Sequence, residues 1–141
     1  MDKAADARYL LDTNICIYIA KGQPSAVRSR FDRHTLNNLA MSAITLGELR
    51  FGAEKSQARQ RALNTIGQLT QVIPAYALPL AAAGHYRQIR AALQKQGQPI
   101  GNNDLWLAAH ARAEGWILVS NNTREFDRVM GLRLENWAEP G

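Results

Sequence analysis

The sequence predicts a single α/β domain, with a central and mostly parallel sheet flanked by helices on both faces. Short apolar runs alternate along the chain with longer segments of helical periodicity, which is typical of a parallel sheet covered on both sides. The 141 residues are enough to bury one sizeable core. An apolar content of 46% with 21% charged residues is typical of a globular protein rather than a disordered one.

The first half of the chain alternates predicted strands and helices. The apolar run 9–11 is expected to be a buried strand. A helix follows Asp12 as far as about Lys21, where Gly22 breaks the pattern. The other elements predicted in this half are a short helix over 25–31, a strand over 39–42, helices over 44–54 and 57–69, and a strand over 72–73 that ends at Pro74.

The second half begins with an Ala-rich helix predicted over 77–96. A Gly/Pro loop at 97–101 separates it from the next helix. That helix is expected to begin after a cap at Asn102 or Asn103 and to stop at Gly115. The last predicted elements are a strand over 116–120, a loop with a short helix over 121–131 and an edge strand over 132–137.

The chain shows no internal repeat, low-complexity segment or linker. The folded domain is therefore expected to span 9–137, after a flexible lead-in at 1–8 and before a C-terminal tail at 138–141. No apolar run approaches the length of a membrane span, and the N-terminus has no signal-peptide core, so a cytoplasmic protein without membrane contact is expected.

Charge and cysteine usage narrow the classes of function. The formal net charge is +5, and 13 of the 17 basic residues are Arg, the side chain best suited to bidentate phosphate contact. This favours a polyanionic partner such as nucleic acid, although exposed basic helix faces would give the same count. The single cysteine, Cys16, excludes an internal disulfide and a cysteine-based zinc site, and its apolar surroundings predict a buried thiol.

Asp12 is the first candidate for a functional residue. It ends the apolar run 9–11 and is followed by Thr13 and Asn14. In open parallel sheets, ligands bind just outside the carboxyl ends of the strands, where a carboxylate calls for a cation. The alternative is that Asp12 or Thr13 simply caps the following helix.

Three further acids fall where helices and strands would present them at the same end of the sheet. Glu48 follows the second strand, Asp104 opens the helix after the Gly/Pro loop, and Glu125 follows the strand over 116–120. Each has a structural alternative. Glu48 would be an exposed helix residue, Asp104 a favourable charge in a first helical turn, and Glu125 a surface partner of a nearby Arg.

If the four acids converge, they repel one another and require divalent cations or protons. A set of Asp, Glu, Asn and Ser oxygens favours Mg²⁺, with Mn²⁺ as the alternative, over zinc. In a basic protein such a site is typical of phosphodiester hydrolysis, in which metal-bound water attacks the phosphate.

Four segments of the chain resemble the motifs of a known family. They are Leu10-Leu11-Asp12-Thr13-Asn14, Thr45-Leu46-Gly47-Glu48-Leu49, Pro99-Ile100-Gly101-Asn102-Asn103-Asp104 and Asn121-Asn122-Thr123-Arg124-Glu125-Phe126. In order and spacing they are similar to the motifs of PIN-domain ribonucleases, and most closely to those of the VapC toxins of type II toxin–antitoxin systems. The likeness runs from Tyr9 to Trp137.

The resemblance implies a PIN-like fold and a metal-dependent endoribonuclease that a VapB-type antitoxin holds inactive. It assigns the metal-binding and catalytic cluster to Asp12, Glu48, Asp104 and Glu125. Asn122 falls where many relatives carry Asp and would be a neutral contributor. The resemblance also implies cleavage of tRNA, in some similar proteins initiator tRNA in the anticodon loop. We expect a homodimer, and the motifs do not identify the RNA-binding residues.

Supporting roles are expected for two hydroxyl groups near the cluster. Thr13 and Ser120 could orient the carboxylates through hydrogen bonds. His85 and His110 have no partner at metal-ligand spacing and are interpreted as core or surface residues. The three tryptophans are interpreted as core. Arg87 and Arg90 share a helix face that would suit RNA or the antitoxin, with a solvated face as the alternative.

Other functional classes fit less well. A haloacid-dehalogenase-like phosphatase needs a second Asp two residues after Asp12, where Asn14 stands. A receiver-type phosphoacceptor needs a late Lys, and none follows Arg112. A catalytically inert PIN-like module that only binds RNA or an antitoxin remains an alternative, opposed by the cost of keeping idle buried carboxylates.

Overall fold

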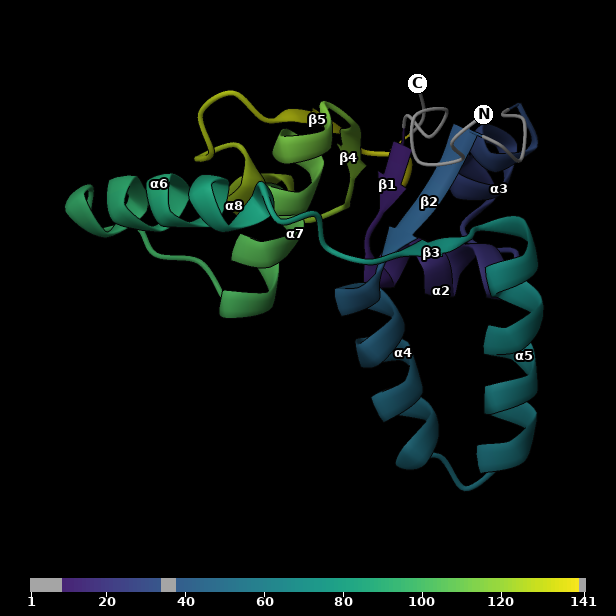
Figure 1. Ribbon diagram of the computed structural model, residues 1–141. Coiled ribbons are helices and arrows are strands. Elements are labelled where there is room, and N and C mark those ends of the chain that lie inside the picture. The colour runs from purple at the N-terminus through teal and green to yellow at the C-terminus, as the bar shows by residue number, and fades with distance from the viewer. Residues whose placement is uncertain (1–8, 34–37, 140–141) are drawn as a thin grey trace, which may run out of the picture.

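The fold is a parallel sheet with helices packed on both faces (Figure 1). The computed structural model describes residues 9–33 and 38–139. Within them the sheet has five strands in the order β3-β2-β1-β4-β5, and every neighbouring pair is parallel. The strands are β1 (Tyr9–Leu11), β2 (Leu39–Ser42), β3 (Ala75–Tyr76), β4 (Ile117–Val119) and β5 (Arg133–Glu135). The predicted α/β class and parallel sheet are confirmed.

The helices divide between the two faces of the sheet. In Figure 1, α6 and α7 lie beside the β4–β5 side, while α4 and α5 run alongside each other as a hairpin that projects from the sheet. The helices are α2 (Thr13–Lys21), α3 (Ser25–Asp32), α4 (Ala43–Glu54), α5 (Arg59–Val72), α6 (Ala82–Lys95), α7 (Asn102–Glu114) and α8 (Thr123–Phe126).

The sheet separates two apolar cores because side chains alternate along its strands. Leu10 of β1 packs into the core beneath α6 and α7. Leu11, the next residue, packs into the core formed with α2, α4 and α5. Both leucines are fully buried. This two-sided burial explains why the central strands read as continuous apolar runs rather than alternating ones.

The strand predicted over 72–73 is wrong. Val72 is the last residue of α5, and Ile73 is buried at the end of that helix. The strand β3 forms only after Pro74, whose carbonyl oxygen accepts a hydrogen bond from the Met41 backbone N at 2.9 Å. Two consecutive apolar residues can end a helix or begin a strand, and hydrophobic periodicity alone does not distinguish the two cases.

Two helix starts also differ from the prediction. The helix expected from residue 77 begins at Ala82, because the turn that contains Pro79 precedes it and the Pro79 carbonyl accepts from Ala82 N. Neither Asn102 nor Asn103 caps α7; the cap position is Gly101, in extended backbone without a side-chain hydrogen bond. The predicted stop at Gly115 is confirmed, with Gly115 in the left-handed conformation at φ 73°.

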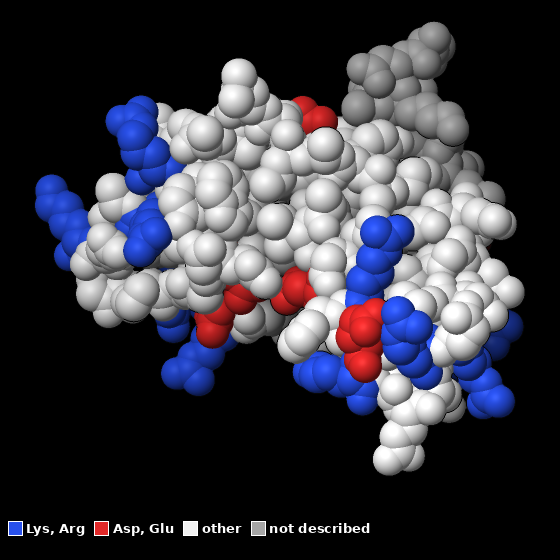
Figure 2. Space-filling view, turned by 60° about the horizontal axis from the view of Figure 1, so that its bottom comes forward, with Lys and Arg blue, Asp and Glu red and all other residues white. Residues whose placement is uncertain are grey.

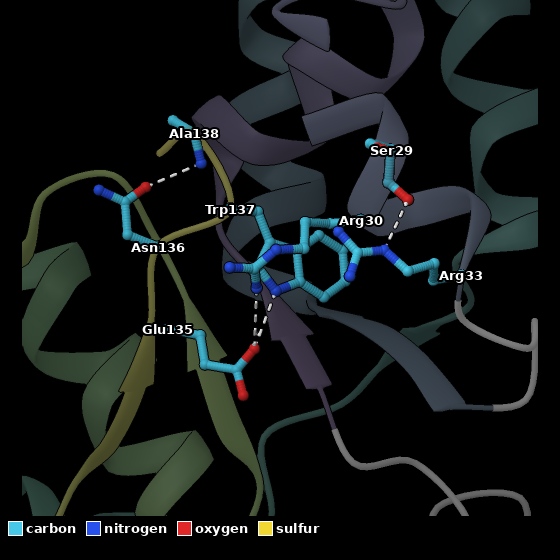
Figure 3. A network of polar contacts seen from close by, with 7 residues as sticks. All are labelled: Ser29, Arg30, Arg33, Glu135, Asn136, Trp137 and Ala138. Atoms are coloured by element: carbon cyan, nitrogen blue, oxygen red, sulfur yellow. Dashed lines mark hydrogen bonds and ion pairs between the residues drawn. The ribbon is translucent and has the colours of Figure 1, made fainter. Parts of the chain in front are cut away.

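A buried tryptophan, Trp137, follows the C-terminal strand β5 (Figure 3). The Trp137 indole packs in the α2–α5 core, and its Nε1 donates to Glu135 Oε1 at 3.0 Å. Arg30 of α3 lies 3.8 Å from the same oxygen. Ala138 N donates to Asn136 Oδ1 at 2.9 Å, so the chain is still anchored there. The expected lead-in at 1–8 and the last two residues of the expected tail lie outside the described residues.

Other composition-based predictions can be checked in the core. Cys16 is fully buried, as predicted. Trp116 and Trp137 are buried, whereas Trp106 is only half-buried. Among the residues that the structure describes, no helix is long and apolar enough to cross a membrane.

Candidate functional site

Asp12 lies at the carboxyl end of the central strand and caps the helix that follows. Its Oδ1 accepts a hydrogen bond from Ile15 N at 3.0 Å, while its own backbone N donates to Val119 O at 3.0 Å. The side chain is only 7% exposed. Burial is the main cause that raises the pKa of Asp12, and repulsion by Glu48 adds to it, against hydrogen bonds from Ser120 and Ile15. Asp12 is thus the N-cap of α2, as the structural alternative predicted, and it also lies at the edge of the sheet where ligands bind.

Thr13 and Glu48 join the first turn of α2 to α4. The Thr13 hydroxyl donates to Glu48 Oε1 at 2.6 Å, across 35 residues of sequence. Glu48 is half-buried. A short hydrogen bond to a carboxylate fixes its orientation, and here it turns Glu48 toward the edge of the sheet where Asp12 lies.

Asp104, in the first turn of α7, is within electrostatic reach of the other three acids. Its pKa is raised to about 6, first by burial and then by repulsion from Glu125, Glu48 and Asp12. A side-chain hydrogen bond with Glu125 favours the protonated form further. The structure therefore brings together the four acids that the sequence separates by as much as 113 positions.

The segment after β4 forms a polar turn. Ser120 is fully buried, and its Oγ accepts from Asn122 N at 2.9 Å. Asn122 precedes α8 but makes no capping side-chain bond. Asn121, which the sequence did not single out, donates from Nδ2 to the Tyr18 hydroxyl at 2.9 Å. Its signal was present in the sequence, as an Asn directly after the strongest strand.

His85 and His110, which the sequence predicts to be core or surface residues, make their hydrogen bonds outside the acid cluster. His85 Nδ1 accepts from Arg112 Nε at 2.8 Å. His110 is fully buried, its Nδ1 lies 3.0 Å from Ser42 Oγ, and desolvation lowers its pKa to about 4. Ser42 also caps α4 by accepting from Ile44 N at 3.2 Å. The neutral histidine thus ties α7 to the cap of the helix that carries Glu48.

A second contact joins α6 to the start of α7 around Asp104. The Tyr86 hydroxyl donates to Asn102 Oδ1 at 2.6 Å and accepts from Arg90 Nη1 at 2.7 Å. The Tyr86 ring stacks on Trp106 with centroids 3.9 Å apart and planes inclined by 19°. One side chain of α6 therefore holds α7 two residues before and two residues after Asp104.

Charged side chains of both signs lie on this face, and at the right of the view acidic and basic side chains lie directly against one another (Figure 2). Acidic side chains lie along the middle of the view, and basic side chains gather on either side of them. An acidic centre flanked by cations suits a polyanion that reaches a bound divalent cation.

The acid cluster offers carboxylate oxygens to a metal ion. In the described part of the chain, no three His, Cys, Asp or Glu side chains are arranged to hold one metal ion. Mg²⁺ does not require such a cage, because it keeps several waters and binds through one or two carboxylates. Four mutually repelling carboxylates, one with its pKa raised to about 6, fit such a hydrated cation.

A groove of about 650 Å³ adjoins the cluster. It begins at Thr13 and Glu48 and continues between α2, α4 and α5 over Leu49, Ile66 and Leu69. Its lining is mainly apolar, with Arg61 and Lys21 as cations.

Comparisons with known proteins identify the family of this chain. A PIN domain family model matches residues 9–132. The chain is 47% identical over 131 residues to the tRNA(fMet)-specific endonuclease VapC of Shigella flexneri, which covers 93% of this chain and 98% of that protein. It is 46% identical to Ribonuclease VapC2 of Haemophilus influenzae, covering 92% and 98%.

Solved structures match over the same extent. A DNA-bound VapBC from Salmonella typhimurium superposes with a TM-score of 0.86 at 40% identity, covering 93% of this chain and 98% of that one. VapBC2 from Rickettsia felis, bound to a DNA fragment from its promoter, gives 0.85 at 35% identity, covering 92% and 98%.

Proposed function

This chain belongs to the PIN domain family, and we propose that it is a ribonuclease toxin of the VapC kind, which cleaves tRNA and is neutralised by a cognate antitoxin. The membership expected from the four motifs is confirmed, because the family match covers most of the chain. The observation that carries the proposal is that Glu125, Glu48 and Asp12 lie close enough to Asp104 for their charges to add to the effect of burial on its pKa. The name of the Shigella flexneri relative supports tRNA(fMet) as the substrate.

The proposed chemistry depends on Mg²⁺, with Mn²⁺ as the alternative. A bound divalent cation would lower the pKa of a water molecule and neutralise charge on the scissile phosphate. The cluster of Asp12, Glu48, Asp104 and Glu125 would supply the one or two carboxylates that hold it, and water would complete the coordination. Thr13 orients Glu48 through its 2.6 Å hydrogen bond, and Ser120 hydrogen-bonds Asp12. Asn122 would contribute a neutral oxygen, which leaves the cluster less negative than one with Asp there.

The partners follow from the relatives. The superposed VapBC structures contain an antitoxin with the toxin, and we propose a VapB-type antitoxin for this chain. A homodimer and a cytoplasmic location stay predictions.

The catalytically inert alternative makes a different prediction about RNA. An inert module would bind RNA without cutting it. Burial, and then repulsion by Glu125, Glu48 and Asp12, raises the pKa of Asp104, and a bound cation would offset both effects, which supports an active site over an idle one.

The test is induced expression followed by mapping of new RNA 5′ ends. We expect one or a few cleavage positions in tRNA with the native chain and none with Asp104→Asn. Asp32→Asn is the matched control, because Asp32 is an exposed acid paired with Arg28 on α3. Growth arrest or cleavage by Asp104→Asn at normal protein levels would remove the assignment.

A further inference from the structure

Phe51 exposes an aromatic ring one helical turn beyond Glu48. Its side chain is 63% exposed, whereas Leu49 and Ala53 on the opposite side of α4 are buried. Residues three apart share a helix face, so Phe51 lies on the face that carries Glu48. Burial in the domain core therefore does not account for this ring, which lies beside the acid cluster.

A cation lies over the same ring. The Lys55 ammonium is 4.5 Å from the Phe51 ring centroid. Arg50 is exposed on the same helix, and Arg61 lines the nearby groove. Arg59 is already paired with Glu54 at 2.8 Å. Figure 2 shows basic side chains gathered at the lower right of the view, over the free end of the α4–α5 hairpin.

We propose that Phe51 is a stacking platform for an unpaired nucleobase of the RNA substrate, and that Lys55 contacts the adjoining phosphate. This rests on the proposed function, because it places the RNA strand along α4 next to the acids. RNA is read largely through unpaired bases that stack on aromatic rings. A cation beside such a ring matches the phosphate that accompanies every base.

The position of the ring favours RNA over a polypeptide as its occupant. The apolar groove runs from Glu48 along Leu49 and Ala53, and Phe51 does not line it. An apolar peptide segment would bury more surface in that groove than on a single exposed ring. A base needs only one flat face and a neighbouring positive charge, which Phe51 and Lys55 supply.

The first test measures binding of a fluorescein-labelled RNA stem-loop by fluorescence anisotropy. The full-length Asp12→Asn chain serves as background so that the RNA stays intact. Adding Phe51→Ala should weaken binding roughly tenfold, the loss of one stacked base. Phe51→Tyr should restore it. Leu80→Ala is the matched control, because Leu80 is 93% exposed and lies before α6; it should leave the affinity unchanged.

The second test separates the ring from the charge. Lys55→Gln should reduce the slope of log affinity against log salt by about 0.7, the value for one phosphate contact on single-stranded nucleic acid. Phe51→Ala should lower the affinity at every salt concentration and leave the slope unchanged. A 2-aminopurine base in the loop should lose fluorescence on binding to the chain with Phe51 and not to Phe51→Ala.

The outcomes separate this inference from the proposed function. Suppose that Phe51→Ala binds and cleaves RNA like the native chain while Asp104→Asn does not cleave. The proposed stacking on Phe51 is then wrong, and the proposed ribonuclease activity is retained. If Phe51→Ala loses only the binding of a co-expressed VapB-type antitoxin, the ring belongs to a polypeptide interface. If the native chain neither cleaves nor binds RNA, both proposals fall.

Discussion

Asp12 caps α2 through Oδ1, and the same carboxylate lies at the edge of the sheet where the other acids meet. The Asp12 carboxylate is therefore both the cap of α2 and a candidate metal ligand. This matters for the design of variants, since a change that removes the charge need not remove the cap. Asn and Asp are about equally good at the N-cap position.

Asp12→Asn should consequently abolish ribonuclease activity without loosening the fold. We expect at least about a 100-fold loss of cleavage rate, beyond what loss of an outer-shell partner costs. The melting temperature should be unchanged or raised without metal, because the pKa of Asp12 shows a carboxylate disfavoured by burial. Cleavage assays and thermal melting check this. Asp12→Ala is the contrasting control and should lower the melting temperature as well. A folded Asp12→Asn chain that still cuts RNA would contradict the assignment.

The pKa of Asp104 gives a prediction about pH. In the unfolded chain this group titrates near its ordinary value of 3.8, and in the metal-free fold near about 6. Its proton therefore stabilises the fold fully below about pH 4, and that stability is lost as the pH rises through about 6. At neutral pH in chelator, Asp104→Asn should melt about 3 °C above the native chain, allowing for solvent screening of a half-exposed group.

The same difference should disappear at low pH, where the native Asp104 is protonated. Melting curves of both chains across this pH range check the sign. Equal melting temperatures at neutral pH would argue that the four carboxylates are not close enough to repel one another.

At the scale of elements, side chains that join two helices support the site. Ser42 links β2, the cap of α4 and His110 of α7. The site acids Glu48 and Asp104 stand on these two helices. The Ser42 hydroxyl is therefore one of the contacts that fix their relative position.

Ser42→Ala should remove both contacts. We expect a loss of about 2–3 kcal/mol, from the missing cap and from the His110 Nδ1 left unpaired in the core. Chemical denaturation measures it. Ser56→Ala is the control, because Ser56 Oγ also accepts a local backbone hydrogen bond but is exposed. An equal effect of the two changes would mean that the bond to His110 contributes nothing.

Tyr86→Phe tests the contact between α6 and the start of α7. The phenyl ring keeps the stack on Trp106, while the bonds to Asn102 and Arg90 are lost. We expect Mg²⁺ affinity about tenfold lower, as for loss of an outer-shell partner, with a small change in stability. Calorimetric titration of Mg²⁺ into the full chain measures it. Arg87→Gln, an exposed change on the same helix, is the control. Unchanged affinity would limit Tyr86 to a packing role.

Prediction from sequence succeeded for elements with a clear period. The strands around Leu10 and Leu118 were predicted because both faces of the sheet are buried there. The four acids were predicted to meet because the carboxyl ends of parallel strands share one edge. These rules need only the order of elements.

The rest depends on contacts that no spacing reveals. The pairs Ser42–His110 and Tyr86–Asn102 form only once α6 and α7 are docked. Gly101 takes the cap position of α7 in place of the expected Asn residues, and the Asn102 side chain accepts a hydrogen bond from Tyr86 instead. The strand predicted over 72–73 was wrong because Ile73 is buried in the core at the end of α5.

At the scale of the whole molecule, repulsion among the acids should destabilise the metal-free fold, and a bound cation should remove that repulsion. Mg²⁺ at about one hundred times its dissociation constant should stabilise the native chain by about 2.7 kcal/mol. Asp104→Asn should respond much less. Melting temperatures with Mg²⁺ and with chelator check this, and Ca²⁺ tests whether charge alone suffices. A native chain whose melting temperature ignores Mg²⁺ would contradict metal binding at this cluster.

The central place of β1 also has a consequence for the timing of synthesis. β1 is made first, yet it pairs with β2 and with β4, whose residues leave the ribosome more than 100 positions later. Such long-range pairing makes folding slow relative to helical proteins of the same size. Asp104 and Glu125 are added in the same late stretch. A partly made chain therefore carries half of the acids and an unfinished sheet, so the acid cluster is complete only when translation is nearly finished.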